Sequence, residues 1–332
     1  MKSSKVLCII AIAVASGTTP LAAPTTGERA FFIEEKIFLN NIPADSGSLQ
    51  IWIPYPVADN YQKISEFKLD APLVASFIKE KEYGNRVIYL SRAGHPGKGK
   101  LEIALSFKVS RKESDLGEDS AVTAEILSRF TKADRLVPVN GRIKELARKI
   151  TAGKKTDMEK ARAIYDYIAN ELTYSRDDPK VCGIGDSLLT LQHKKGICSD
   201  YHSLFISLAR SLGIPAKFEI GFPVPQDTES GTIKGYHCWA KFYVKEKGWV
   251  PVDISEADKH PERLDYFFGH IDENRVHLTT GRDIGLKHAK GSGPLNFFVY
   301  PYAELNGSRI DDLDIQVTYK DLKGGVSSEK DI

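Results

Sequence analysis

The spacing of apolar residues changes between residues 120 and 140, and this change restricts the fold more than any other feature of the chain. Before it, apolar and polar residues alternate in short runs separated by segments rich in Gly, Pro and Asp. Alternation with a period of two is typical of β-strands, and several short runs between turn signals favour a β-sandwich. We therefore predict an N-terminal β-sandwich domain over residues 24–120, which ends in a polar linker and has strands at residues 31–33, 36–39, 49–54, 86–90 and 101–109.

After residue 140 the apolar residues recur every three or four positions, which indicates amphipathic helices. Helices are predicted at residues 143–150 and 157–172, the second with a capping-box start at Thr156 and Glu159. A third runs from Cys198 to Gly213, with a buried stripe of Phe205, Leu208, Ala209 and Leu212. Helices followed by antiparallel strands predict an α+β fold for residues 121–305, with strands at residues 216–221, 236–244, 249–254 and 296–302. Residues 306–332 are predicted to hold a C-terminal strand and a polar tail.

The first 23 residues have the pattern of a secretory signal peptide. Lys2 and Lys5 precede an apolar run at residues 6–15, and small residues follow up to Ala23. The apolar run is too short to remain as a spanning helix. We therefore expect an exported protein, periplasmic or secreted, with no stable transmembrane segment in the mature chain. The alternative is an N-terminal membrane anchor that is never cleaved.

Charge and cysteine content weigh against two classes of protein. The chain has 46 basic and 44 acidic residues, and loss of Lys2 and Lys5 with a signal peptide would leave 44 of each. A balanced charge without a basic block argues against a nucleic-acid partner. The same cleavage would leave Cys182, Cys198 and Cys238, which are too few for a disulfide scaffold. An odd number leaves one thiol unpaired, and in an oxidising compartment this favours a working cysteine.

Three residues have the local context that thiol acyl transfer requires. Cys198 opens a helix two residues after Gly196, where unpaired N–H groups and the helix dipole lower a thiol pKa and can stabilise an oxyanion. His237 begins an alternating strand whose other face is apolar, so its imidazole is expected to face the site while Cys238 packs inward. Asp253 ends the next strand, where it can accept a hydrogen bond from the imidazole.

Each of these residues also has a structural interpretation when taken alone, as a buried cysteine, a packing histidine or a turn aspartate. Their occurrence in this order favours chemistry. A zinc site built from Cys198, His202, His237 and Cys238 is the competing arrangement. The chain has no Cys-x-x-Cys pair, and alternation sends His237 and Cys238 to opposite faces. We therefore predict no metal and no cofactor.

Two further residues are candidates for contact with a substrate or an oxyanion. Gln192 lies six residues before Cys198, and its amide can donate to an oxyanion if it faces the site. It is equally consistent with an exposed glutamine. Trp239 is predicted either to wall the site or to belong to the core.

The segments around these residues are similar to the core of the transglutaminase-like superfamily. Four of them carry the resemblance, in order and spacing: residues 196–201, 209–216, 235–239 and 248–253. The resemblance extends from Val137 to Asp253 and more loosely to Tyr302. It implies a papain-like core, a helix bundle packed on an antiparallel sheet, with Cys198 as nucleophile, His237 as base and Asp253 as the residue that orients the base. Residues 267–283 resemble bacterial exported members, and no Asp-x-Asp-x-Asp-Gly calcium loop is present.

Two functions remain open at this stage. The first is a cysteine peptidase or amide acyltransferase that acts on peptide or isopeptide bonds through a thioester, with cell-wall peptides of a Gram-negative periplasm as one candidate substrate. The second is an exported binding or scaffold module that holds a partner without turnover. The sequence leaves the acyl acceptor, the oligomeric state and the role of the β-domain undetermined.

Overall fold

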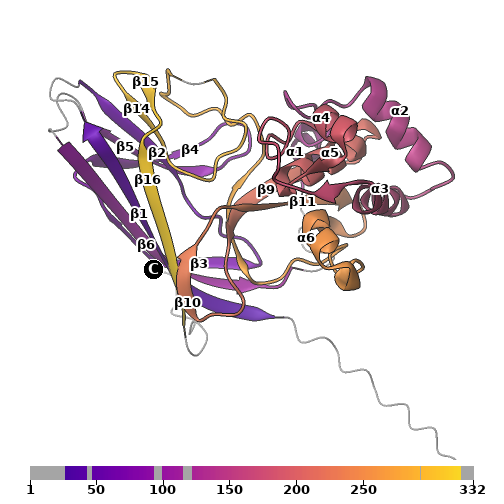
Figure 1. Cartoon of the computed structure of the whole chain (residues 1–332), viewed down its shortest axis with the longest axis horizontal. Coiled ribbons are helices and arrows are strands. Elements are labelled where there is room, and N and C mark those ends of the chain that lie inside the picture. Colours follow the sequence, from indigo (N-terminus) through magenta and orange to yellow (C-terminus); the bar gives the residue numbers. More distant parts are fainter. Residues whose placement is uncertain (1–26, 43–46, 93–98, 115–121, 292, 323–332) are drawn as a thin grey trace, which may run out of the picture.

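The computed structural model describes residues 27–42, 47–92, 99–114, 122–291 and 293–322, and the predicted signal peptide and polar tail lie outside these ranges. The fold is mixed α+β, as predicted from the sequence. Antiparallel sheets lie on one side of the molecule and the helices on the other (Figure 1). In the described part of the chain, no helix combines the length and apolar character needed to cross a membrane.

Two five-stranded antiparallel sheets form the β-domain. The first has the strand order β10-β16-β1-β6-β3 and contains β10 (Ser230–Ile233), β16 (Leu313–Asp321), β1 (Glu28–Ile42), β6 (Gly99–Lys112) and β3 (Gln62–Asp70). The second has the order β15-β14-β2-β5-β4 and contains β15 (Ser308–Ile310), β14 (Tyr302–Leu305), β2 (Leu49–Pro54), β5 (Arg86–Arg92) and β4 (Val74–Lys79).

Strands from both ends of the chain build this β-domain. β16 pairs with β1 over nine residue pairs, from Phe31 with Asp321 to Leu39 with Leu313, and β14 pairs with β2. The chain therefore returns to the first sheets after the helical region, and the yellow C-terminal strands lie among the indigo ones in Figure 1. The domain boundaries at residues 120 and 305 stay predictions, but residues 24–120 supply only part of the two sheets.

The helices surround α5 (Cys198–Ser211), every residue of which is buried. The sequence predicted burial of only one face of this helix, at Phe205, Leu208, Ala209 and Leu212. The other faces are buried too, because α2, α3, α4 and α6 pack against the helix. The Thr156–Glu159 capping box at the start of α3 is present as predicted. The other helices are α1 (Ala124–Arg129), α2 (Gly141–Ile150), α3 (Asp157–Glu171), α4 (Ser187–His193), α6 (Ile254–Lys259) and the 3₁₀ turn η1 (Pro261–Arg263).

A four-stranded antiparallel sheet, in the order β12-β11-β9-β13, lies between α5 and the β-domain. Its strands are β12 (Gly248–Val252), β11 (His237–Val244), β9 (Ala216–Pro223) and β13 (Arg275–Thr280). Strands β7 (Thr173–Tyr174) and β8 (Lys195–Gly196) form a separate two-stranded sheet. One face of the four-stranded sheet packs on α5, where the rings of Phe205 and Phe242 lie 5.9 Å apart. The edge strand β13 meets β3, since the Gln62 side chain hydrogen-bonds the backbone of His277.

Several predicted elements differ from the structure. The strand predicted at residues 296–302 is wrong except at its end, because Phe297 packs its ring against Phe218 and Tyr236 instead of joining a sheet. The polar linker predicted at residues 111–120 is wrong at residues 111–112, which belong to β6, and its residues 115–120 lie outside the described ranges. Strands β3, β4 and β13 were not predicted.

Candidate active site

Cys198 is the first residue of α5, and the backbone before it is held in place by one carboxylate. Asp200 accepts hydrogen bonds from the N–H groups of Ile197 at 2.8 Å, Gly183 at 2.6 Å and Gly185 at 2.7 Å. A Cβ atom on Gly196 would lie 2.4 Å from the Asp200 side chain, so this position requires glycine. The start of α5 is therefore fixed, with Cys198 at the positive end of the helix dipole.

His237 and Asp253 lie in direct contact. The Nε2 atom of His237, at the start of β11, is 2.7 Å from Oδ2 of Asp253. Asp253 is the N-cap of α6, and its Oδ1 atom accepts from the Glu256 N–H and the Ser255 hydroxyl, both at 3.2 Å. The helix cap therefore fixes the carboxylate, and the carboxylate fixes the ring. With Nε2 engaged in this way, the other ring nitrogen, Nδ1, is left to interact with Cys198, whose charge contributes to raising the pKa of His237.

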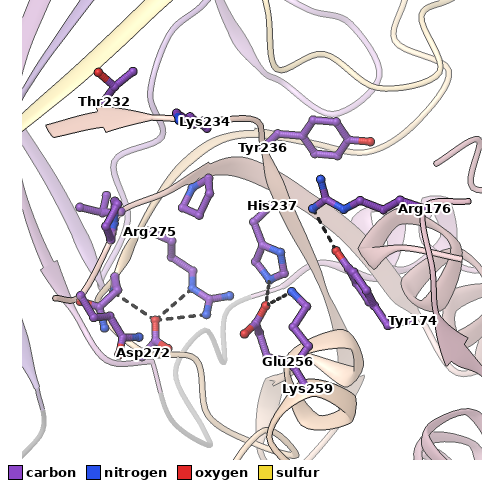
Figure 2. A pocket seen from close by; sticks show the side chains of 15 residues that line it. Tyr174, Arg176, Thr232, Lys234, Tyr236, His237, Glu256, Lys259, Asp272 and Arg275 are labelled. Carbon is purple, nitrogen blue, oxygen red and sulfur yellow. Dashed lines mark hydrogen bonds and ion pairs between the residues drawn. The ribbon is translucent and has the colours of Figure 1, made fainter. Parts of the chain in front are cut away.

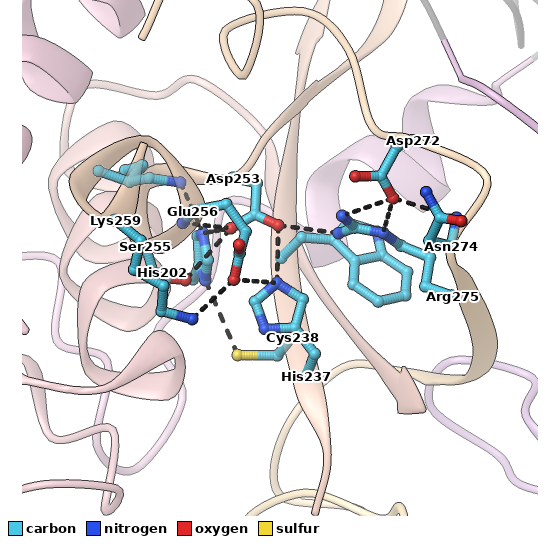
Figure 3. A network of polar contacts seen from close by, with 12 residues as sticks. His202, His237, Cys238, Asp253, Ser255, Glu256, Lys259, Asp272, Asn274 and Arg275 are labelled. Atoms are coloured by element: carbon cyan, nitrogen blue, oxygen red, sulfur yellow. Dashed lines mark hydrogen bonds and ion pairs between the residues drawn. The ribbon is translucent and has the colours of Figure 1, made fainter. Parts of the chain in front are cut away.

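A buried arginine also forms an ion pair with Asp253. Arg275, at the start of β13, donates from NH1 to Oδ2 of Asp253 at 2.8 Å and from NH2 to Oδ1 of Asp272 at 3.1 Å. Figure 3 shows this arrangement, with Asp253 between the imidazole and the guanidinium. Both cations favour the ionised carboxylate, and the pKa of Asp253 is held well below its usual range by His237 and Arg275 despite burial.

The electrostatics favour a thiolate–imidazolium pair. Burial alone would lower the pKa of His237, but the charge and hydrogen bond of Asp253 outweigh it and raise that pKa to about 10. Hydrogen bonds from Cys238 and then His237 lower the pKa of Cys198 well below its usual value, against the effect of burial. These two shifts act in the same direction and favour a thiolate on Cys198 beside a charged imidazole on His237.

Cys238 and His202 lie behind this pair, on the α5 face of the sheet. The Sγ atom of Cys238 is 3.7 Å from Nδ1 of His202, and burial together with the neighbouring Cys198 raises the pKa of Cys238 well above its usual value. Cys238 is therefore a neutral thiol that donates toward Cys198. Nε2 of His202 accepts from the Ile254 N–H at 3.0 Å, and burial lowers the pKa of His202 to about 4. His202 is thus a neutral ring that ties α5 to the segment after β12.

A pocket of about 390 Å³ opens beside the imidazole. Its walls come from the ends of β9 and β10, from α6, and from the segments before β11 and β13 (Figure 2). His237 lines it and is 7% exposed, whereas Cys198 is 3% exposed and lies outside the lining residues. Tyr236 lines the pocket and lies close enough to Cys198 for a charge on this sulfur to raise the pKa of the Tyr236 hydroxyl, after the larger effect of burial. The described residues contain no group of three or more His, Cys, Asp or Glu side chains arranged to hold a metal ion.

Neither of the two further candidates, Trp239 and Gln192, lines the pocket. Trp239 is fully buried, and its indole N–H donates to Glu219 at 2.7 Å, so this donor is already engaged. Its ring supports His237 from below, with centroids 6.4 Å apart, and Arg275 lies 5.2 Å from the ring. Gln192 is exposed on α4 and does not line the pocket. The structure therefore brings Cys198, His237 and Asp253 together and leaves Gln192 outside.

The sequence analysis did not identify Arg275, Asp200 or the role of Cys238. Arg275 opens a strand that was not predicted, and its partners are set by the tertiary fold. Cys238 was expected to pack inward, which it does, but α5 covers that face and places Cys198 beside it. Asp200 could have been recognised, because an acidic residue three positions after a helix start is a capping signal.

These features define an α+β core with a thiol, an imidazole and a carboxylate gathered at the start of its central helix. Residues 144–254 match the model of the transglutaminase-like superfamily, and this part of the chain is a transglutaminase-like core. A solved structure from Cytophaga hutchinsonii, described as a candidate cysteine protease, has a TM-score of 0.59 at 17% identity and covers 91% of this chain and 93% of its own. That likeness concerns the fold.

Two relatives are similar in sequence. An uncharacterized protein of Haemophilus influenzae is 25% identical over 356 residues, which cover 92% of this chain and 96% of that protein. The uncharacterized protein YebA of Bacillus subtilis is 26% identical over 136 residues, which cover 37% of this chain and 18% of that protein. The first similarity includes the β-domain as well as the core, so the two parts occur together in another protein.

Proposed function

We propose that this protein is a cysteine-dependent hydrolase or acyltransferase that acts on peptide or isopeptide amides. The observation that supports it most strongly is the contact of His237 with Asp253 at 2.7 Å, next to Cys198 at the start of α5, whose charge acts on the same imidazole. This is the arrangement of nucleophile, base and orienting carboxylate that covalent acyl transfer needs. Buried acid–base pairs of this kind are more frequent at reactive sites than in structural cores.

The reaction proceeds in two steps. The Cys198 thiolate attacks the amide carbonyl carbon, and N–H groups in the first turn of α5 stabilise the resulting oxyanion. The carbon–nitrogen bond then breaks as His237 gives its proton to the departing amine, which leaves a thioester on Cys198. In the second step His237 removes a proton from water or from a second amine, which attacks the thioester and releases the thiolate. Asp253 stabilises the charged imidazole throughout.

Access to the sulfur requires movement, because Cys198 is only 3% exposed. Tyr236 is the side chain we assign to this role, since it is half-buried, lines the pocket and lies near enough to Cys198 to feel its charge. Rotation of its ring would join the pocket to the thiol. Export of the protein, to the periplasm or beyond it, remains part of the proposal and rests on the pattern of residues 1–23.

Labelling with iodoacetamide at neutral pH, followed by mass spectrometry, tests the proposal. Cys198 should react faster than Cys182 and Cys238, because it alone is expected to be a thiolate with a route to solvent. A peptide library should then leave an acyl adduct on Cys198, and Cys198→Ala should abolish it. Equal labelling of the three thiols, with no adduct, would refute an activated nucleophile.

The burial of Cys198 also favours a second candidate, a module that binds a partner in the pocket without turnover. Under this alternative, Cys198→Ala retains both the binding of the partner and the biological effect. Under the first, the variant still binds substrate but no longer releases product.

A further inference from the structure

The pocket beside His237 lies on one side of the proposed nucleophile. It is lined by the imidazole, and Cys198 is not among its lining residues. In acyl transfer the group that protonates the departing nitrogen must face that nitrogen. The part of a substrate that occupies this pocket is therefore the part attached to the nitrogen, which leaves as the amine. An incoming amine acceptor would use the same side.

Most charges that line the pocket already have partners. Asp272 is held by Arg275 at 3.1 Å, and Glu256 is held by Lys259 at 2.7 Å. The two exceptions are cations. In the described part of the chain neither Arg176 nor Lys234 has an acidic side chain within ion-pair distance, although both line the pocket and both are exposed.

The Tyr174 side chain holds Arg176 in the pocket. The NH2 group of Arg176 donates to the Tyr174 hydroxyl at 3.3 Å, and the Arg176 guanidinium lies 6.0 Å from the centre of the Tyr174 ring. Lys259 lies 4.4 Å from the same ring. Figure 2 shows the Arg176 guanidinium pointing toward His237, with Tyr236 above the guanidinium and Lys234 further along the same segment of the chain. One side of the pocket therefore has an excess of positive charge around an oriented guanidinium.

We propose that this pocket binds a carboxylate carried by the leaving-group side of the amide substrate, with Arg176 as its main partner and Lys234 as a second cation. The inference rests on the proposed amide chemistry and adds a substrate class to it. A guanidinium presents two parallel N–H donors that match a carboxylate, which makes arginine the appropriate residue for this recognition. The released amine would then be an amino acid or a short peptide with a free or side-chain carboxylate close to its nitrogen.

Binding to the Cys198→Ala protein tests this inference separately from catalysis. The probe is a randomised N-acetyl tetrapeptide library made in three forms: with a C-terminal carboxylate, with a C-terminal carboxamide, and with a carboxamide after a fixed glutamate. The amount of each form retained by immobilised protein is measured by mass spectrometry. Arg176→Gln in the same background removes the guanidinium. Arg148→Gln, on the exposed face of α2 away from the pocket, is the matched control.

The carboxylate form should be retained about five- to tenfold more than the carboxamide form, and the preference should shrink in about 1 M salt. Arg176→Gln should abolish most of this preference, whereas Arg148→Gln should keep it. Retention of the glutamate form would place the carboxylate on a side chain, and its loss would place it at the chain end. Equal retention of all three forms, or a preference that survives Arg176→Gln, would overturn the inference.

The proposed function is tested separately in the same experiment with the intact Cys198 protein. Turnover of the carboxylate and carboxamide libraries at equal rates would refute the carboxylate subsite and keep the amide chemistry. A strong preference for binding the carboxylate form without any turnover would keep the carboxylate subsite and refute the amide chemistry.

Discussion

Glu35 lies in the core of the β-sandwich without a counter-charge. It is 3% exposed and lies on the same face of β1 as the buried residues Ile33 and Ile37, and its Oε1 atom has no hydrogen-bond partner in the described part of the structure. Burial raises the pKa of this carboxyl from 4.5 to about 8. The folded protein therefore keeps Glu35 protonated at pH values where the unfolded chain has already ionised it.

This difference makes the stability of the fold depend on pH. Between pH 4.5 and 8 the folded state holds a proton that the unfolded state has lost, so the free energy of unfolding falls as the pH rises. The fall is about 1.4 kcal/mol per pH unit and reaches about 5 kcal/mol near pH 8, above which it stays constant. Glu35→Gln has nearly the same volume and no proton to lose. The variant should match the wild type near pH 4.5 and exceed its unfolding free energy by about 5 kcal/mol near pH 9.

Guanidinium unfolding of the full chain at about pH 5 and about pH 9 measures this difference, and hydrogen exchange of the β1 amides assigns it to the sandwich. Glu34→Gln is the matched control, because Glu34 is half-buried on the other face of β1 and pairs with Lys36 at 3.4 Å. An ion pair of that kind is worth at most about 1 kcal/mol. The same pH dependence in wild type and Glu35→Gln would refute the assignment of this proton to Glu35.

Three further predictions concern the candidate site. Asp253→Asn removes the charge that raises the pKa of His237, so that pKa should fall toward its usual value and iodoacetamide labelling of Cys198 at neutral pH should slow by about tenfold or more; an unchanged labelling profile would contradict the thiolate–imidazolium pair. Cys238→Ala removes a hydrogen-bond donor to Cys198, so the midpoint of its labelling profile should move to higher pH, by about one unit, while Cys182→Ala leaves it in place. Arg275→Gln leaves Asp253 and Asp272 buried with less counter-charge and should lower the free energy of unfolding by about 3–5 kcal/mol in a denaturant titration. Arg309→Gln, at an exposed ion pair, should change it by less than about 1 kcal/mol.

The three candidate residues could be singled out from the sequence because each has a local signal. Cys198 follows a glycine at a helix start, His237 opens an alternating strand and Asp253 closes the next one, and all of these signals lie within a few residues of sequence. Helix α3 was predictable for the same reason, since its capping box is formed by residues three positions apart. Whether these residues have the proposed roles is a matter for the experiments above.

The missing elements have no such local signal. Strand β4 is exposed at nearly every position, and β3 is mostly exposed, because each lies at the edge of its sheet. Without one buried face a strand does not alternate, and its sequence resembles a loop. The apolar run near Phe297 gave the opposite error, because a strand was predicted where the structure has none. Its residues are apolar because they cover Phe218 and Tyr236, and burial alone does not distinguish a strand from an irregular segment.

Charged side chains on the second face of the central sheet explain why the β-domain concerns the site. Glu219 and Lys241 are almost fully buried on this face, 3.5 Å apart, and the ring of Tyr61 from the β-domain lies 5.3 Å from the ammonium of Lys241. Such charges are retained in water-free surroundings only when partners surround them, and here part of those surroundings belongs to the β-domain.

Arg275 lies in the same strand as His277, whose backbone is hydrogen-bonded by Gln62 of β3. The β-domain therefore holds the strand that carries the guanidinium, and the guanidinium holds Asp253 against His237. The β-domain therefore affects the candidate site in two ways. It positions strand β13, and it excludes water from the interface with the central sheet. Loosening that interface would admit water to Arg275 and weaken its ion pair with Asp253. This effect does not require a contact between the β-domain and Cys198.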